Sequence, residues 1–161
     1  MSEAQAQFVQ LRDRLLTFVR NPTRRRMVIA IDGRDGAGKS PTARCLSWHL
    51  QMPAIETDMY FVRDSRPIKY RYEDLSRVIH SRLDSDRPVI VEGIFVLKTL
   101  KKMNLVPDFH ILVEATSFAG SCGLEAELDQ YFDQYKPDER CDFKLRWDDN
   151  NVERKLPFQC A

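Results

Sequence analysis

Short, continuously apolar segments recur along the chain, separated by longer segments in which apolar and polar residues alternate with a helical period. The three most apolar segments lie at 27–31, 88–91 and 109–113 and are rich in valine and isoleucine. Runs of this length with almost no polar position are typical of strands that are covered on both faces, as in the centre of a parallel sheet. We therefore expect a strand at each of these three positions.

The segments around these strands predict helices and two weaker strands. The first helix is expected over about 3–20, because Pro22 excludes helical geometry at the residue before it. A short strand is expected at 53–57, and an edge strand at 141–146. Further helices are expected over 39–50, 73–83, 97–103 and 124–135. The apolar face expected for the helix at 73–83 consists of Leu75, Val78, Ile79 and Leu83.

Strands that alternate with helices predict an α/β fold, in which parallel strands are joined by right-handed crossovers. The 161 residues are enough for one hydrophobic core and few for two. We therefore expect a single domain over 1–161, with a five-stranded, mainly parallel sheet flanked by helices in three layers.

The turn after the first apolar strand reads GRDGAGKS at 33–40 and matches the phosphate-binding pattern GxxxxGK[ST], the Walker A motif, at every fixed position. Glycines let backbone N–H groups approach phosphate oxygens, and the following helix directs its positive end at the same anion. This P-loop predicts bound ATP with Mg²⁺, in which Lys39 contacts the β- and γ-phosphates and the Ser40 hydroxyl is a ligand of the metal. The residues expected to bind the nucleotide are Gly33, Asp35, Gly36, Ala37, Gly38, Lys39, Ser40 and Pro41.

Four acids near the P-loop have separate expected roles. Asp58 and Glu92 each follow a predicted strand, at the edge of the sheet where ligands gather in open α/β folds. A carboxylate there can hold Mg²⁺, and another near an acceptor can take a hydroxyl proton. The alternatives are a loop cap for Asp58 and a surface acid for Glu92. We expect Asp32 to brace the loop and Asp35 to face solvent.

The segment 58–72 is the candidate acceptor-binding loop. Arg63 and Arg66 could clamp a polar or anionic acceptor, although arginines on such a segment often face water only. Tyr60 could stack on a planar substrate, or it could seat the loop on the core. We predict that Asp58, Tyr60, Arg63 and Arg66 bind the acceptor.

The bulk composition excludes several classes of partner. A net charge of +1 and a pI near 7.7 do not indicate a nucleic-acid-binding surface. The sequence contains no apolar run long enough for a membrane span. The four cysteines form no CxxC pair, which predicts free thiols and a cytoplasmic protein. The three histidines are expected to be structural, and the oligomeric state stays open.

Several of these segments together resemble the uridine kinase-like branch of P-loop nucleoside and small-molecule kinases. The resemblance covers about 26–113 and includes IDGRDGAGKS, TDMYF at 57–61, YEDLSRVI at 72–79 and PVIVEGIFVL at 88–97. It implies a P-loop NTPase fold and a transferase that moves the γ-phosphate of ATP to a hydroxyl of a small molecule. It also implies that Asp58 contacts and deprotonates this hydroxyl and that Glu92 lies at the Mg²⁺ site.

The region 114–140 departs from this pattern. Such kinases carry an arginine-rich lid there, whereas this chain has no arginine from 114 to 139. We interpret the region as a reduced lid, in which Arg140, a candidate catalytic residue, or Lys136 supplies a cation for the transferred phosphoryl group. The alternative function is a nucleotide-binding module with weak or no phosphoryl transfer, which acts in regulation or through a partner. A GTPase is not indicated, because the sequence has no NKxD segment.

Overall fold

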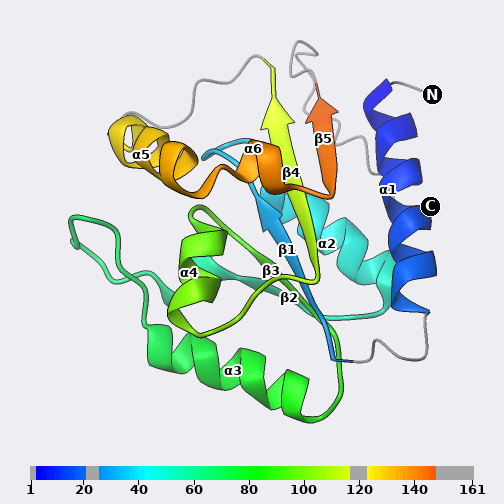
Figure 1. Cartoon of the computed structure of the whole chain (residues 1–161), viewed down its shortest axis with the longest axis horizontal. Coiled ribbons are helices and arrows are strands. Elements are labelled where there is room, and N and C mark those ends of the chain that lie inside the picture. The colour runs from blue at the N-terminus through cyan, green and yellow to red at the C-terminus, as the bar shows by residue number, and fades with distance from the viewer. Residues whose placement is uncertain (1–2, 21–25, 117–122, 148–161) are drawn as a thin grey trace.

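The computed structural model describes residues 3–20, 26–116 and 123–147. Within them the chain forms a five-stranded sheet with the strand order β2-β3-β1-β4-β5, in which all paired strands are parallel (Figure 1). The predicted α/β fold is confirmed. The strands are β1 (Val28–Asp32), β2 (Ala54–Glu56), β3 (Val89–Glu92), β4 (Phe109–Ala115) and β5 (Phe143–Trp147).

Helices cover both faces of the sheet and give the three expected layers (Figure 1). Strand β1 alternates between these layers, as its twofold period requires. Ile29 and Ile31 pack with the first two helices, whereas Val28 and Ala30 pack with the third and fourth. The helices are α1 (Glu3–Val19), α2 (Lys39–Leu50), α3 (Tyr72–Asp84), α4 (Val96–Lys102), α5 (Glu125–Tyr135) and α6 (Pro137–Arg140).

Each strand and helix expected from the sequence is present, with small shifts at the ends. The short helix α6 and the 3-10 turn η1 (Thr57–Tyr60) were not expected. The burial of Val78 was predicted wrongly, because its side chain is 42% exposed on α3. None of the described helices has the length and apolar character needed to cross a membrane. Cys141 is a free thiol and Cys45 is buried in the core, whereas Cys122 and Cys160 lie outside the described residues.

The register of the strands brings three chain segments to one edge of the sheet. Glu92 at the end of β3 lies beside Ile31 of β1 and beside Glu56 of β2. The P-loop follows β1 and η1 follows β2, so both begin at this edge. Parallel pairing therefore gathers the segments that carry the predicted site residues.

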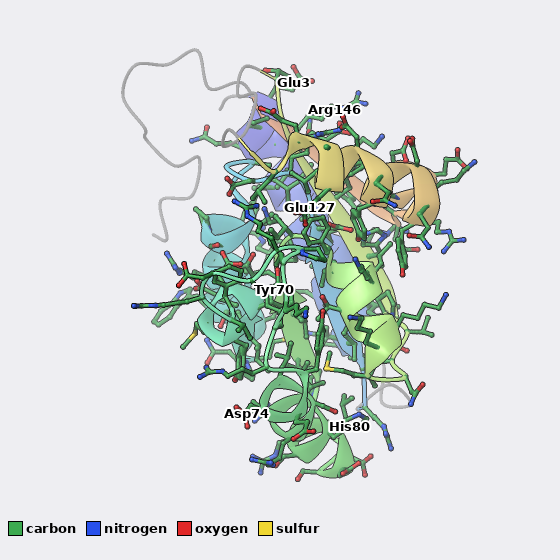
Figure 2. The ribbon with its side chains drawn as sticks, turned by 90° about the vertical axis from the view of Figure 1, so that its left-hand side faces the viewer. Glu3, Tyr70, Asp74, His80, Glu127 and Arg146 are labelled. Atoms are coloured by element: carbon green, nitrogen blue, oxygen red, sulfur yellow. The ribbon has the colours of Figure 1, made fainter. Side chains whose placement is uncertain are left out.

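The segment after η1 folds back on itself as a narrow loop. Phe61 and Tyr70 form an antiparallel bridge, and the Arg71 amide donates a hydrogen bond to the Tyr60 carbonyl at 2.8 Å. Tyr70 is buried at the base of this loop, and Figure 2 shows it near the middle of the molecule, below Glu127 of α5. The candidate acceptor-binding loop is therefore anchored at its base, while its tip is exposed.

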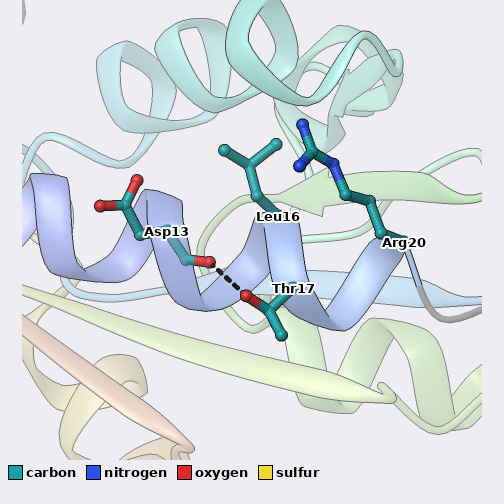
Figure 3. Close-up of a pocket in the computed structure, with 4 residues that line it drawn as sticks. All are labelled: Asp13, Leu16, Thr17 and Arg20. Atoms are coloured by element: carbon teal, nitrogen blue, oxygen red, sulfur yellow. Dashed lines mark hydrogen bonds between the residues drawn. The ribbon is translucent and has the colours of Figure 1, made fainter.

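A hollow of about 450 Å³ beside α1 contains none of the predicted site residues (Figure 3). Leu16 and Arg20 point to the same side of the helix in this view, and the Thr17 hydroxyl donates to the Asp13 carbonyl at 3.0 Å. Asp13, Leu16 and Thr17 belong to α1 and Arg20 directly follows it, so the hollow is a feature of the α1 surface and contains no P-loop residue.

Replacement of Gly93 by alanine tests the packing between β3 and η1. Gly93 has φ of 155°, and an added Cβ would lie 1.8 Å from the Thr57 hydroxyl oxygen. Gly93→Ala is expected to lower the free energy of unfolding by about 3 kcal/mol or more, measured by urea denaturation.

Gly123→Ala is the matched control for this substitution. Gly123 also has positive φ, 101°, but its added Cβ would meet no atom closer than 4.0 Å. Its expected cost is about 1–2 kcal/mol, from backbone strain alone. Equal losses in the two variants would contradict the close contact with Thr57.

Candidate nucleotide-binding site

The P-loop connects the end of β1 to the first residue of α2 and has an unusual backbone. Gly33, Gly36 and Gly38 have φ of 150°, 73° and 92°, which side chains with a Cβ rarely allow. At Gly33 an added Cβ would also lie 2.3 Å from the Val113 carbonyl oxygen of β4. The glycine positions of the motif are therefore required by the backbone path and, at Gly33, by the packing against β4.

Asp32 holds the start of the P-loop in place. Its side chain is 0% exposed, and one oxygen accepts a hydrogen bond from the Gly33 amide at 2.8 Å. The other oxygen accepts a short hydrogen bond from the Tyr131 hydroxyl of α5. The expectation that Asp32 braces the loop is confirmed, and its partner on α5 is a contact that the sequence did not predict.

The Lys39 ammonium is buried inside this loop, with 7% of the side chain exposed. Its Nζ donates a hydrogen bond to the Arg34 carbonyl at 2.7 Å. Burial lowers the pKa of Lys39, while the negative charges of Glu92, Asp32, Asp35 and Asp58 act in the opposite direction. These four acids therefore surround one cation at the edge of the sheet.

Ser40 and Glu92 form a direct pair at this edge. The Ser40 hydroxyl donates a hydrogen bond to Glu92 Oε1 at 2.8 Å, and Glu92 is only 1% exposed. Burial raises the pKa of Glu92, whereas the Ser40 hydrogen bond and the Lys39 charge lower it. The two residues that were predicted to share a metal position are thus side by side.

The Ser40–Glu92 pair fits the way proteins hold Mg²⁺. No group of three or more His, Cys, Asp or Glu side chains that could hold a metal occurs in the described parts of the chain. Mg²⁺ in phosphate-transfer sites takes one or two protein oxygens, and waters and phosphates complete its shell. A hydroxyl and a carboxylate beside a phosphate loop supply this donor set.

Asp58 lies on η1 and takes part in the same cluster of charges. Partial burial raises its pKa, the Lys39 charge lowers it, and the nearby Asp35 and Glu56 carboxylates raise it. We expected Asp35 to face solvent, but its side chain is half-buried, so this expectation is only partly met. The structure thus brings Asp58 into electrostatic contact with the P-loop lysine.

The predicted acceptor residues separate into different surroundings. Tyr60 packs against the core beneath α3, and the Arg71 guanidinium lies 5.9 Å from its ring, which favours the seating role. Arg63 is exposed at the tip of the loop. Arg66 donates to the Gly123 carbonyl at 3.3 Å and lies 3.8 Å from Glu127, so it contacts the segment at the start of α5.

The structure does not bring Arg140 to the P-loop, so its candidate catalytic role is not supported. Arg140 ends α6 and lines a cavity with Lys101 at the end of α4 and with the segment 105–107. This segment leads into the amino end of β4, whereas the P-loop follows the carboxyl end of β1. Because β1 and β4 are parallel, these two positions lie at opposite ends of the strands. No pattern in the sequence indicates where α6 would lie.

Sequence reasoning missed the residues that join the P-loop to α5. Arg34 of the loop forms an ion pair with Asp129 at 2.5 Å, and its guanidinium lies 4.9 Å from the Phe132 ring. The Tyr131 hydroxyl reaches Asp32 from the same helix. No short motif marks such contacts between residues almost a hundred positions apart in the chain.

Comparison with known proteins identifies the fold. No family model and no curated protein matches the sequence. A possible uridine kinase from Bacillus stearothermophilus superposes with a TM-score of 0.63 and 17% identity over 89% of this chain and 100% of the other. A candidate fructose transport system kinase from Silicibacter sp. TM1040 gives 0.51 and 16% over 82% of each chain. The chain therefore has the fold of the uridine kinase-like P-loop kinases.

The substitution Glu92→Gln tests whether the buried Glu92 charge lowers the free energy of unfolding. Because the pKa of Glu92 is raised above 4.5 in the folded chain, the folded state binds a proton more tightly than the unfolded state does. The free energy of unfolding therefore falls as the pH rises from 4.5 to the raised pKa, by about 1.4 kcal/mol per pH unit in that interval. Without nucleotide, Glu92→Gln should be more stable than wild type at pH 7, measured by urea denaturation across pH.

Glu73→Gln is the control for this measurement, since Glu73 is an exposed acid on α3. It should leave the stability and its pH profile close to those of wild type. A Glu92→Gln variant that is less stable than wild type at pH 7 would contradict the raised pKa.

Proposed function

We propose that the protein is an ATP- and Mg²⁺-dependent kinase that transfers the γ-phosphate to a hydroxyl of a nucleoside or another small molecule. The observation that supports it best is the arrangement of Ser40, Glu92 and Asp58 around the buried Lys39 ammonium. Phosphoryl transfer depends mainly on positioning and on electrostatic stabilisation, which such an arrangement supplies.

The residues fit the nucleotide that this proposal requires. In the described part of the chain, the one hydrogen bond of Lys39 Nζ goes to the Arg34 carbonyl. An ammonium has three donors, so two remain for phosphate oxygens. The positive φ angles of Gly33, Gly36 and Gly38 keep side chains away from the path of the anion. When bound, Mg·ATP supplies the transferable phosphoryl group.

Asp58 is the proposed base for the acceptor hydroxyl. Its carboxyl is exposed on η1, next to the loop that carries Arg63, so an acceptor can approach it from solvent. Its pKa is raised mainly by partial burial, and a more basic carboxylate accepts a hydroxyl proton more readily. The proposed partner is a small hydroxylated molecule, and the proposed location is the cytoplasm. A nucleic acid is not proposed, because the net charge is only +1, and a membrane is not proposed, because no described helix could cross one.

A second candidate function is a nucleotide-binding module with weak or no phosphoryl transfer. The observation that favours it is the absence of arginine from 114 to 139 in the sequence, together with the position of Arg140 away from the P-loop. Arginines that contact the transferred group can contribute several orders of magnitude to the rate. The module would bind ATP through the same residues and would act through a partner.

Nucleotide binding is tested by thermal unfolding with and without Mg·ATP. At about 100 times its Kd, a ligand that binds only the native state stabilises it by about 2.7 kcal/mol, on the order of 5–10 °C in Tm for a chain of this size. Lys39→Ala is expected to remove this shift. Lys102→Ala, at the exposed end of α4, is the control and should keep it. No shift in wild type at millimolar ATP would contradict ATP binding.

Phosphoryl transfer is tested by ADP release with a panel of nucleosides, sugars and other small alcohols. Asp58→Asn is expected to lower acceptor-dependent turnover by about 10²- to 10⁴-fold, because a neutral amide cannot take the hydroxyl proton. Its Mg·ATP-dependent Tm shift should remain. Asp64→Asn, in the same exposed loop, is the matched control and should keep turnover. Binding of ATP without turnover on any acceptor would favour the module.

A further inference from the structure

A second cavity, of about 560 Å³, lies between the end of α4, the amino end of β4 and helices α5 and α6. Its volume is within the range of small-molecule sites, about 300–1,000 Å³. Its apolar lining includes Leu97 and the segment 105–107, which joins α4 to β4. The P-loop is at the opposite end of the strands, so this cavity is separate from the proposed nucleotide site.

The charged groups of this cavity are suited to an anion. Lys101 and Arg140 line it from α4 and α6, and both are exposed to solvent. Arg140 has no ion pair among the residues that the structure describes. The single acid, Asp142, already accepts a hydrogen bond from the His110 amide at 2.8 Å. The cavity therefore offers two cations and one engaged carboxylate beside an apolar wall.

His110 is the most unusual residue of the cavity wall. It is 3% exposed, and within the described residues neither ring nitrogen has a hydrogen-bond partner. Its Nε2 lies 3.6 Å from an oxygen of Asp32, beyond hydrogen-bonding distance. Buried polar groups without partners are rare in folded proteins and call for an explanation. The buried ring therefore lies between the cavity that it lines and the Asp32 carboxylate.

Three lining residues contact the group that braces the P-loop. His110 faces Asp32, the Leu97 amide donates to the Tyr131 hydroxyl at 3.1 Å, and Tyr135 stacks on Tyr131 at 5.1 Å. The Tyr131 hydroxyl in turn donates to Asp32, which holds the Gly33 amide. A ligand that moves any of these lining residues therefore changes the surroundings of Asp32.

We propose that this cavity binds a small organic anion with an apolar body, and that its occupancy changes nucleotide affinity through His110, Tyr131 and Asp32. Lys101 and Arg140 pair with the anionic group, and the apolar wall covers the rest of the ligand. The coupling to nucleotide rests on the proposed function, whereas binding of the anion does not.

Binding is tested with 1-anilinonaphthalene-8-sulfonate, an organic sulfonate with an aromatic body, by fluorescence titration of the full chain without nucleotide. Wild type is expected to bind one equivalent saturably. Lys101→Gln and Arg140→Gln should each weaken binding by about fivefold, and the double variant by on the order of tenfold or more. Lys102→Gln is the matched control for charge and should bind as wild type does.

Two outcomes would overturn the site. Equal binding by wild type and the double variant would show that the cavity is not where the probe binds. Loss of binding in Arg20→Gln or Lys39→Ala, with binding retained in the double variant, would place the probe beside α1 or in the P-loop instead. Circular dichroism melting of each variant checks that the fold is kept.

The coupling is tested by measuring the affinity for Mg·ATP with and without saturating probe. A change of about fivefold or more is expected, and the reciprocal change must appear in the affinity for the probe. His110→Phe keeps an aromatic ring without the nitrogens and should still bind the probe. In this variant the affinity for Mg·ATP should be nearly the same with and without the probe. If that variant does not fold, Tyr135→Leu interrupts the stacking contact to Tyr131.

These measurements separate the failure of each proposal. Probe affinity that is the same with and without nucleotide, in a wild type that binds ATP, would overturn the coupling. A wild type that does not bind ATP would instead overturn the proposed function, and the probe titrations would still test the cavity.

Discussion

The P-loop end of the sheet depends on one buried cation. Asp32 and Glu92 are almost completely removed from solvent, and Asp35 and Asp58 lie close enough to act on the same lysine. Several carboxylates cannot stay ionised together in a poorly hydrated place without a positive charge among them. The Lys39 ammonium supplies it, although its own burial lowers its pKa. The lysine charge therefore lowers the cost of the buried acids. Loss of the lysine would leave several carboxylates without a positive charge, whereas loss of one acid would leave the lysine with the other three.

The topology explains how these charges come together. Glu92 and the start of η1 reach the same edge as the P-loop because β1, β2 and β3 run in the same direction. They lie next to one another there because β3 is between β1 and β2. The sequence could not show the strand order, because order depends on contacts between distant segments. It could show where each apolar run ends, and parallel strands end at one edge in any order. For this reason the position of Asp58 and Glu92 at this edge could be predicted from local pattern alone.

The contacts that the sequence did not reveal are those that depend on tertiary placement. The Tyr131–Asp32 hydrogen bond joins residues 99 positions apart, and the Arg34–Asp129 ion pair joins residues 95 positions apart. Exposed arginines and acids have no periodicity that would pair them. The same limit explains Arg140, whose position followed from a short helix that no pattern indicated. His110 was correctly expected inside a strand, but its unpaired ring nitrogens could be seen only in three dimensions.

Helix α5 contacts both the P-loop and the candidate acceptor-binding loop through ion pairs. The charges are reversed relative to the pattern that the sequence resemblance implies. There the lid carries arginines, whereas here α5 carries Asp129 and Glu127, and the arginines belong to the loops, as Arg34 and Arg66. Both pairs are solvent-exposed, and exposed pairs contribute only about 0–1 kcal/mol each. The segment 114–139 contains no arginine, and the cations that contact α5 come instead from the P-loop and from the loop at 58–72.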